Sequence, residues 1–391
     1  MRLLKYLVIK SIVAAPCFIV LFAVSKTYAS CPNENPSEES CFAPSASAPD
    51  EKHHRLRKYL LYDVNPGEGF NLRRDVYMRV ARLVAALRMG PDHEDWVLVL
   101  PPWGPLYHWR SKGLGPQMKI KWKEFFDTNS LGGFVPVMEF EDFHHAVGPT
   151  IDKVFYLQHY PSTFSSTTWD EKFEEGPCLE ETPYYEEEGG TFKLHIRRSM
   201  RFASSLRDVA DKFRQDVLNS DDERDDTVLE EDWKIIPNRT RYALGGPYLA
   251  VHLRRQDYVN SRPKDVPDLK WAAEQIHTLL QKRGLKKVFV ATDAGDDEFK
   301  TLKTYLPEAV RFEPSNEVRK QLKDGGLAIV DQWIAAHARF FVGSYESTFS
   351  FRIQEEREIM NFDPDTTFNR LCGNGQKTCT QPTRWRVAYT D

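Results

Sequence analysis

Long apolar segments are almost missing from this chain of 391 residues. The one run of that kind, Ser11–Val24, has 14 residues, whereas a membrane-spanning helix needs about 20. Basic residues precede it, and Ala29 or Ser30 follows as a small residue for cleavage. We therefore expect residues 1–30 to be a signal peptide, with a signal anchor as the alternative, and no membrane span after it.

The chain also has little net charge, a formal value of −4, which argues against a general nucleic-acid-binding protein. Acidic residues gather locally in Glu171–Glu188 and Asp221–Asp226, which we expect to be solvated loops or helix edges. Residues 31–50 are rich in Ser, Pro, Glu and Ala and are expected to be a flexible leader.

Cysteine is scarce, with six in the chain, and Cys17 would leave with the signal peptide. Those that remain are Cys31, Cys41, Cys178, Cys372 and Cys379. Cys372 and Cys379 flank a Gly-Asn-Gly loop and are expected to form a disulfide. Cys31 with Cys41 would leave Cys178 free, and Cys178 with either of them is equally open. The spacings fit no zinc motif.

Clean N-glycosylation sequons are limited to one, at Asn238, because Pro36 spoils the sequon at Asn35. Together with the signal peptide and the expected disulfide, this sequon favours the secretory pathway. No DxD-like pair suggests a metal site: caps and turns explain Asp296-Asp297 and Asp363-Pro364-Asp365.

What the chain does have is a repeated alternation of short apolar strands with longer helical patterns. Alternation of this kind predicts an α/β fold with parallel sheets covered by helices on both faces. It occurs in two blocks, 51–243 and 244–391, which we expect to be two doubly wound domains. The expected strands are 59–62, 96–100, 134–140, 154–158, 248–253, 287–292, 310–312 and 340–342. The expected helices begin near Phe70 and cover 197–217, 269–282, 296–305, 327–338 and 347–358.

The first candidate site is the segment Asp63–Tyr77, a strand end, a glycine turn and a helix start. Gly67 and Gly69 begin the dinucleotide pattern G-x-G-x-x-G, but Leu72 stands where the third glycine belongs, so the match is weak. Glu68 is a carboxylate in the middle of this turn. It could take a proton from an attacking hydroxyl, although a plain strand-to-helix turn is the alternative.

Two further candidate sites lie in the second block. At the end of strand 248–253, His252 and Arg254 share one face, where parallel sheets hold phosphates. A surface ion pair between Arg255 and Asp257 is the alternative. The second site combines Asp331 with Thr348 and Ser350 at a strand-to-helix junction, where N–H groups and hydroxyls could meet phosphate oxygens. Ordinary helix capping, and a helix-surface aspartate, are the alternatives there.

Four motifs in this order resemble the protein O-fucosyltransferases, specifically the type that modifies thrombospondin type 1 repeats. They are YLLYDVNPGEGFNLRRDVY, WVLVLPPWGPLYHW, HLRRQDY and FFVGSYESTFSFRIQEERE. The resemblance covers residues 55–390. One departure is Gly67, where the family pattern has a proline. The type that modifies epidermal-growth-factor-like repeats shares the glycine turn and the HLR element but less of the rest.

The resemblance implies a GT-B glycosyltransferase, with two Rossmann-like domains facing across a cleft. The reaction it implies is inverting transfer of fucose from GDP-fucose to a Ser or Thr hydroxyl of a folded thrombospondin type 1 repeat, in a C-x-x-[ST]-C context. Glu68 matches the catalytic base, and Arg254 matches the residue that stabilises the leaving GDP. The donor contacts it implies are Gly67, Gly69, Phe70, Asn71, His252, Leu253, Arg254, Asp331, Thr348 and Phe349.

The resemblance further implies a soluble monomer of the endoplasmic reticulum lumen that requires no metal cofactor, although Mn²⁺ could stimulate it. Two alternatives remain open from the sequence. One is the sister activity on epidermal-growth-factor-like repeats, and the other is a non-catalytic secretory chaperone for disulfide-rich repeats.

Overall fold

The computed structural model describes residues 57–64, 67–91, 93–111, 113–149, 151–152, 195–235 and 241–384, and the backbone alone of residues 5–8, 19–25, 153–155, 191–193 and 386–388. The leader 31–50, the sequon residue Asn238, and Cys31, Cys41 and Cys178 lie outside the described residues. Among the helices of these ranges, none combines the length and apolar character that a membrane span requires.

The chain forms two compact units, each built from separate stretches of sequence. Unit 1 comprises Met1–Asn65, Val80–Pro101 and Val135–Glu175, and unit 2 comprises Pro66–Arg79, Pro102–Phe134 and Gly176–Asp391. These units do not follow the expected boundary between residues 243 and 244. The glycine turn and the aromatic loop after residue 101 belong to the same unit as the second sheet.

The sheet of unit 1 is mixed. Strands β3 (Lys58–Val64), β4 (Trp96–Leu100) and β5 (Val137–Glu139) are parallel. β2 (Ile19–Ser25) is antiparallel to β3, and β1 (Lys5–Val8) and β6 (Lys153–Phe155) are antiparallel to β2. The expected strand 134–140 is wrong at its ends, because β5 is short and helix α3 (Phe140–Val147) begins directly after it. α3 contributes Phe143 to a core with Tyr59, Leu61, Val97 and Val99.

Strands β1 and β2 fall within residues 1–30, where the sequence predicts a signal peptide. Cleavage after Ala29 would remove both strands and leave β3 at the edge of the sheet. The signal peptide stays a prediction.

The sheet of unit 2 is parallel throughout, in the order β10 (Ala309–Val310), β9 (Val288–Thr292), β8 (Gly246–Leu253) and β11 (Ala338–Val342). Numbered by chain order, this is 3-2-1-4, the order of one half of a Rossmann fold. The direction of winding reverses between β8 and β11. In open parallel sheets, ligands bind beside the carboxyl ends of the two strands at that point.

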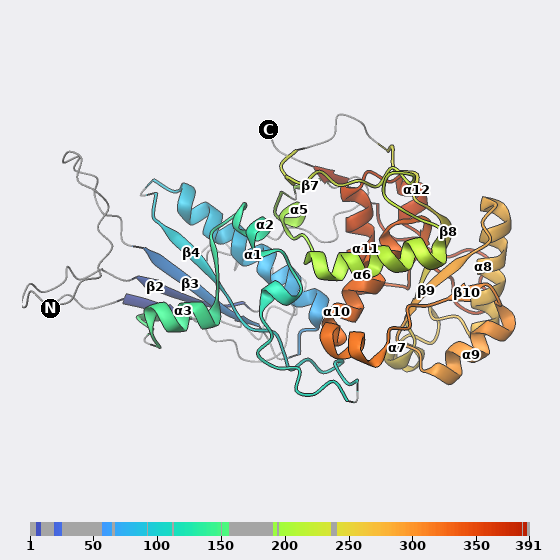
Figure 1. The fold of residues 1–391 in the computed structure, drawn as a ribbon, viewed down its shortest axis with the longest axis horizontal. Coiled ribbons are helices and arrows are strands. Elements are labelled where there is room, and N and C mark those ends of the chain that lie inside the picture. The colour runs from blue at the N-terminus through green and yellow to red at the C-terminus, as the bar shows by residue number, and fades with distance from the viewer. Residues whose placement is uncertain are drawn as a thin grey trace, which may run out of the picture. The chain divides into compact units, whose positions relative to one another are not determined.

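Helices cover both faces of this sheet (Figure 1), which confirms the expected α/β architecture. On one face, α8 (Leu269–Arg283) and α9 (Asp296–Tyr305) pack on alternate residues of the strands. On the other face, Phe213 at the end of α6 (Ser204–Phe213) lies 5.9 Å from Phe289, centroid to centroid. α10 (Asn316–Ala336) also lies there, where its Ile334 carbonyl accepts a 2.5 Å hydrogen bond from the Tyr248 hydroxyl.

The expected single helix 197–217 is wrong. Three elements replace it: α5 (His195–Ser199), α6, and the π-helical turn η3 (Arg214–Leu218). The chain is extended at Phe202 because that residue pairs with Phe126 in an isolated β-bridge. The expected helix 327–338 begins earlier, at Asn316, and has a kink at Lys323, whose φ is 58°. The remaining elements are η1 (Trp122–Glu124), α1 (Phe70–Met89), α2 (Thr128–Gly132), β7 (Thr191–Lys193), α7 (Gln256–Ser261), α11 (Thr348–Ile359), α12 (Pro364–Thr367) and β12 (Arg386–Ala388).

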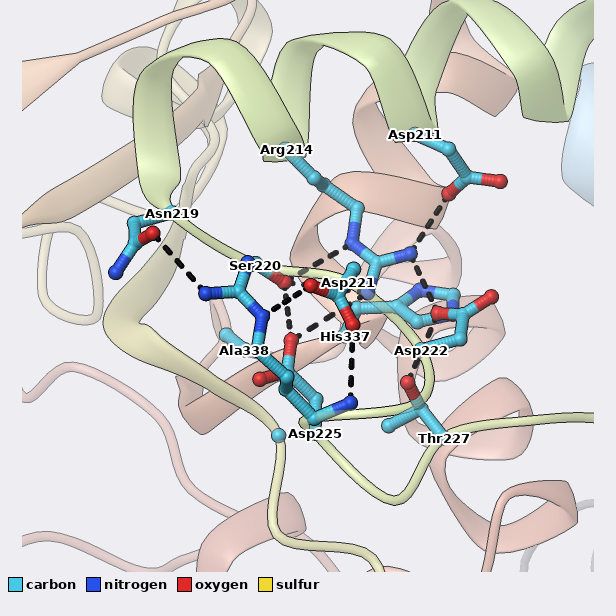
Figure 2. Close-up of polar contacts among 12 residues, drawn as sticks. Asp211, Arg214, Asn219, Ser220, Asp221, Asp222, Asp225, Thr227, His337 and Ala338 are labelled. Carbon is cyan, nitrogen blue, oxygen red and sulfur yellow. Dashed lines mark hydrogen bonds and ion pairs between the residues drawn. The ribbon is translucent and has the colours of Figure 1, made fainter.

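The acidic run Asp221–Asp226 is not simply the solvated loop that the sequence suggested. Arg214 is 1% exposed and donates 2.7 Å hydrogen bonds to both Asp211 and Asp222. Its guanidinium also bonds the Ser220 hydroxyl, which contacts Asp225 at 2.5 Å. Figure 2 shows this arginine pointing into the middle of the group. A buried cation requires such pairing, and the cluster ties the loop to α6.

The predicted disulfide between Cys372 and Cys379 is confirmed, with an S–S distance of 2.05 Å. Asp296 forms an ion pair with Arg311, and Asp363 caps α12 by accepting a hydrogen bond from the backbone of Asp365. The interpretation as cap and turn residues is therefore confirmed at Asp363. At Asp296 an ion pair takes its place.

Candidate active site

The carboxyl ends of β8 and β11 supply one side of the site. His252, the second-last residue of β8, is 3% exposed, and its Nδ1 lies 2.8 Å from the Ser350 hydroxyl. Its ring stacks on Phe349 with centroids 4.4 Å apart. Burial, together with the charge of Arg254, lowers the pKa of His252 to about 3, so the imidazole is neutral. His252 thus orients the start of α11. The Leu253 side chain is 1% exposed in the core, which leaves its backbone as the part that could approach a donor.

Arg254 follows β8 and is held in a defined place by carboxylates. Its Nη2 lies 2.8 Å from Asp257, its Nε lies 3.3 Å from Asp293, and its guanidinium lies 5.0 Å from the centroid of Tyr258. Burial lowers the pKa of Arg254, but Asp293 and Asp257 outweigh it and raise the pKa overall. The guanidinium is permanently cationic and partly exposed, as a phosphate-binding arginine must be.

The alternative ion pair between Arg255 and Asp257 is wrong. Arg255 bonds Glu298 at 2.5 Å instead, and Arg254 takes Asp257. Strand alternation predicts that Arg254 and Arg255 point in opposite directions, and their partners do differ. The alternation could not identify those partners.

The start of α11 offers backbone N–H groups. Ser347 occupies the N-cap position without a side-chain capping hydrogen bond. Ser350 does not cap the helix either, because its hydroxyl bonds His252 and accepts a hydrogen bond from the Ser344 N–H. Thr348 and Phe349 are half-buried in the first turn. A helix N-terminus without a side-chain cap, close to Arg254, is suited to bind phosphate oxygens.

Asp331 lies on α10 and retains partial exposure. Burial raises its pKa to about 8, and Arg311 and Arg319 act in the opposite direction. The next residue, Gln332, is completely buried and donates a 2.9 Å hydrogen bond to the Asn71 side chain. A raised pKa at a carboxyl group that stays partly exposed makes Asp331 a candidate binding position.

The glycine turn belongs to this same unit. Gly67 is exposed, Glu68 is half-buried, and Phe70 begins α1. Burial raises the pKa of Glu68, as does the nearby carboxylate of Asp75, while Arg73 and Arg79 oppose them. A carboxylate with a raised pKa is a stronger base than an ordinary glutamate, which suits it to accept a proton from a hydroxyl.

Two of the predicted donor contacts are used inside the protein. The Phe70 ring is 2% exposed and packs against Trp103 and Phe125, with centroid separations of 4.9 Å and 5.5 Å. The Asn71 side chain accepts the hydrogen bond from Gln332. Both residues anchor the glycine turn, and their side chains serve as supports here.

The sequence reasoning missed a buried cluster of charges beneath the turn. Arg352 on α11 lies 2.6 Å from Asp75 on α1 and 3.0 Å from Glu355. Arg197 on α5 pairs with Glu355 at 2.6 Å and with Glu356 at 2.5 Å. These charges join the helix that follows Glu68 to the helix that begins at Thr348. All five residues are charges within helices expected from the sequence, but nothing in their spacing showed that they would be buried together.

His108, in the loop after β4, is a further residue that the sequence did not identify as part of the site. This loop is rich in aromatic residues, namely Trp103, Tyr107, His108 and Trp109. Trp103 packs in the core at 2% exposure, Tyr107 is 53% exposed, and Trp109 lies 5.8 Å from Phe70. His108 accepts a hydrogen bond from the Phe70 N–H at 3.3 Å. Among the described residues, no group of His, Cys, Asp and Glu is arranged to hold a metal ion.

Comparisons with known proteins show the family of this chain. Residues 59–360 match the family model described as GDP-fucose protein O-fucosyltransferase. The human protein named GDP-fucose protein O-fucosyltransferase 2 is 44% identical over 432 aligned positions, which cover 95% of this chain and 98% of that protein. The Caenorhabditis elegans protein of the same name is 42% identical, covering 85% of this chain and 91% of that protein. The match spans both units and every candidate site residue from Glu68 to Phe349. This chain is a glycosyltransferase that belongs to the GDP-fucose protein O-fucosyltransferase family.

Proposed function

We propose that the protein transfers fucose from GDP-fucose, with inversion at the sugar, to Ser or Thr hydroxyls of folded thrombospondin type 1 repeats. The observation that carries this proposal is the pairing, in one unit, of a glutamate of raised pKa at a glycine turn with an arginine beside an uncapped helix N-terminus. The names of the relatives support the donor and the second enzyme type.

The proposed roles follow from the chemistry of inversion. Glu68 removes the proton from the acceptor hydroxyl as that oxygen attacks the anomeric carbon. Arg254 and the N–H groups at Thr348 and Phe349 stabilise the diphosphate as the bond from sugar to phosphate breaks. Arg254 must exchange its contact with Asp257 or Asp293 for the diphosphate, and both carboxylates keep its guanidinium oriented until then. Gly67 and Gly69 let sugar and acceptor approach the backbone.

Asp331 is proposed to accept hydrogen bonds from the N–H groups of guanine. This assignment gives a pH prediction, because burial raises the pKa of Asp331 to about 8. At neutral pH the carboxyl is mostly protonated, and guanine N–H donors require the ionised form. Binding therefore releases a proton, and GDP affinity should rise with pH up to about 8, by at most about tenfold per pH unit. Calorimetric titrations with GDP between pH 6 and pH 9 measure this slope.

The Asp331→Asn variant is the control for that titration. It should bind GDP weakly and with little pH dependence beyond that of the GDP phosphates. If the GDP affinity of the wild type showed the same pH dependence as that of Asp331→Asn, Asp331 would not be a guanine contact.

The acceptor type is tested by offering the purified protein folded thrombospondin type 1 repeats and folded epidermal-growth-factor-like repeats with labelled GDP-fucose. We expect label on the first type only. Label on the second type would favour the sister activity. A repeat that binds while GDP-fucose gives no heat in calorimetry would favour the chaperone alternative. The same assay in EDTA, with and without added Mn²⁺, tests the expectation that no metal is required.

A further inference from the structure

His108 lies at the N-terminus of α1, directly after the glycine turn. Phe70 is the first residue of that helix, and its N–H donates to His108 Nε2 at 3.3 Å. The first N–H groups of a helix have no partner within the helix, so an acceptor from elsewhere satisfies one of them. Here the acceptor comes from a loop 38 residues along the chain, in place of a side chain at the helix start.

Gly69 makes this position of the imidazole feasible. A Cβ atom on Gly69 would lie 2.7 Å from His108 Cε1, closer than two carbon atoms can approach. The absence of a side chain at residue 69 therefore serves the histidine, in addition to any approach of sugar or acceptor. The contact also fixes the backbone on the carboxyl side of Glu68.

The hydrogen bond defines the state of the ring. An imidazole nitrogen accepts only when it carries no proton, so His108 must be neutral with its hydrogen on Nδ1. Burial lowers the pKa of His108, and Arg254 and Arg73 act in the same direction. Asp257 on α7 and Asp324 on α10 act in the opposite direction without reversing the shift. The edge of the Tyr107 ring, 4.5 Å away between centroids, covers it from its own loop.

We propose that neutral His108 is a positioning residue for the transfer reaction, holding the glycine turn so that the Glu68 carboxylate is aimed at the acceptor hydroxyl. This inference rests on the proposed function. Protonation of His108 would remove the acceptor for the Phe70 N–H and would place a further positive charge beside Arg73 and Arg254. Acid should therefore slow the reaction in two ways, by protonating Glu68 and by protonating His108.

The test compares His108→Ala with His108→Gln, because a glutamine oxygen can reach the position of Nε2. We expect His108→Ala to lower kcat by about 10- to 100-fold, the cost typical of misplacing a catalytic group, with GDP affinity unchanged within about threefold. His108→Gln should restore kcat to within about threefold of wild type. In acid, kcat of the wild type should fall more steeply with pH than that of His108→Gln, with an extra loss of at most about 10- to 100-fold, because protonated His108 acts like the alanine variant.

His145→Gln, at an exposed histidine of α3, is the matched control and should behave as wild type. Full activity in His108→Ala would overturn the proposal, and so would equal losses in the alanine and glutamine variants. Gly69→Ala should cost much less in the His108→Ala background than alone, because the clash is then relieved. If the wild type transfers no fucose, the proposed function fails on its own. The nitrogen chemical shifts of His108 then still decide between a neutral ring protonated on Nδ1, as inferred, and any other state.

Discussion

Replacing Glu68 with glutamine should lower the rate of fucose transfer by about 10²- to 10⁴-fold, the usual loss when a general base is removed. The substitution keeps the size and shape of the side chain and removes only its ability to accept the proton. GDP affinity should stay within about threefold of wild type, because the proposed diphosphate and guanine contacts lie on β8, α10 and α11. Initial rates at saturating donor, together with calorimetry for GDP, measure the two effects separately.

Asp63→Asn is the matched control, an equivalent change at an exposed carboxylate five positions before Glu68. It should leave the rate unchanged within about twofold. A Glu68→Gln enzyme that kept most of its activity would show that another group takes the proton.

The pH dependence of the wild-type rate offers a second check on Glu68. Burial and the carboxylate of Asp75 raise the pKa of Glu68 above the ordinary glutamate value of 4.5. The loss of activity in acid should therefore begin at a higher pH than an ordinary glutamate would give.

The second large effect concerns stability. Arg352→Met should destabilise the protein by about 3–5 kcal/mol, the cost of removing one partner from a buried ion pair. Arg352 is completely buried, and the substitution would leave the carboxylates of Asp75 and Glu355 without that guanidinium. Methionine has a similar length and adds no polar group, so the loss reports the missing guanidinium, while Glu355 keeps its ion pair with Arg197. The midpoint of urea unfolding, followed by tryptophan fluorescence, measures it.

Lys212→Met provides the comparison at a surface pair. Lys212 and Asp216 lie 2.8 Å apart, but their side chains are 77% and 57% exposed, and such pairs contribute about 0–1 kcal/mol. The two variants should therefore differ by several kcal/mol although each removes one cation from an ion pair of similar length. Equal midpoints for both would mean that the buried cluster tolerates a missing charge.

The parts of the site that depend on local sequence could be predicted. His252 and Arg254 stand at the end of a continuous apolar strand, and parallel sheets bring such ends to one edge. Thr348 comes shortly after the last apolar strand of the second block, 340–342, and its place at a helix start follows from the same alternation. The disulfide between Cys372 and Cys379 could be predicted because the two cysteines are close in the chain.

The parts that depend on contacts distant in the chain could not. Asp75 and Arg352 are 277 positions apart, and nothing in their local sequence indicates that they form a pair. His108 carries no motif, and its role depends on a glycine 39 positions earlier that leaves room for the ring. The two compact units differ from the expected domains for a related reason. Contacts group Pro66–Arg79 with the second sheet, although those residues directly follow a strand of the first.

We propose that GDP-fucose binds at the carboxyl ends of β8 and β11 with its sugar directed to Glu68. The decisive experiment is a crystal structure of the Glu68→Gln variant with GDP-fucose. We expect the guanine within hydrogen-bond distance of Asp331 and the diphosphate on Arg254 and the N–H groups at Thr348 and Phe349. The anomeric carbon should face the side chain of residue 68. A diphosphate bound away from Arg254, or a sugar directed away from the glycine turn, would contradict it.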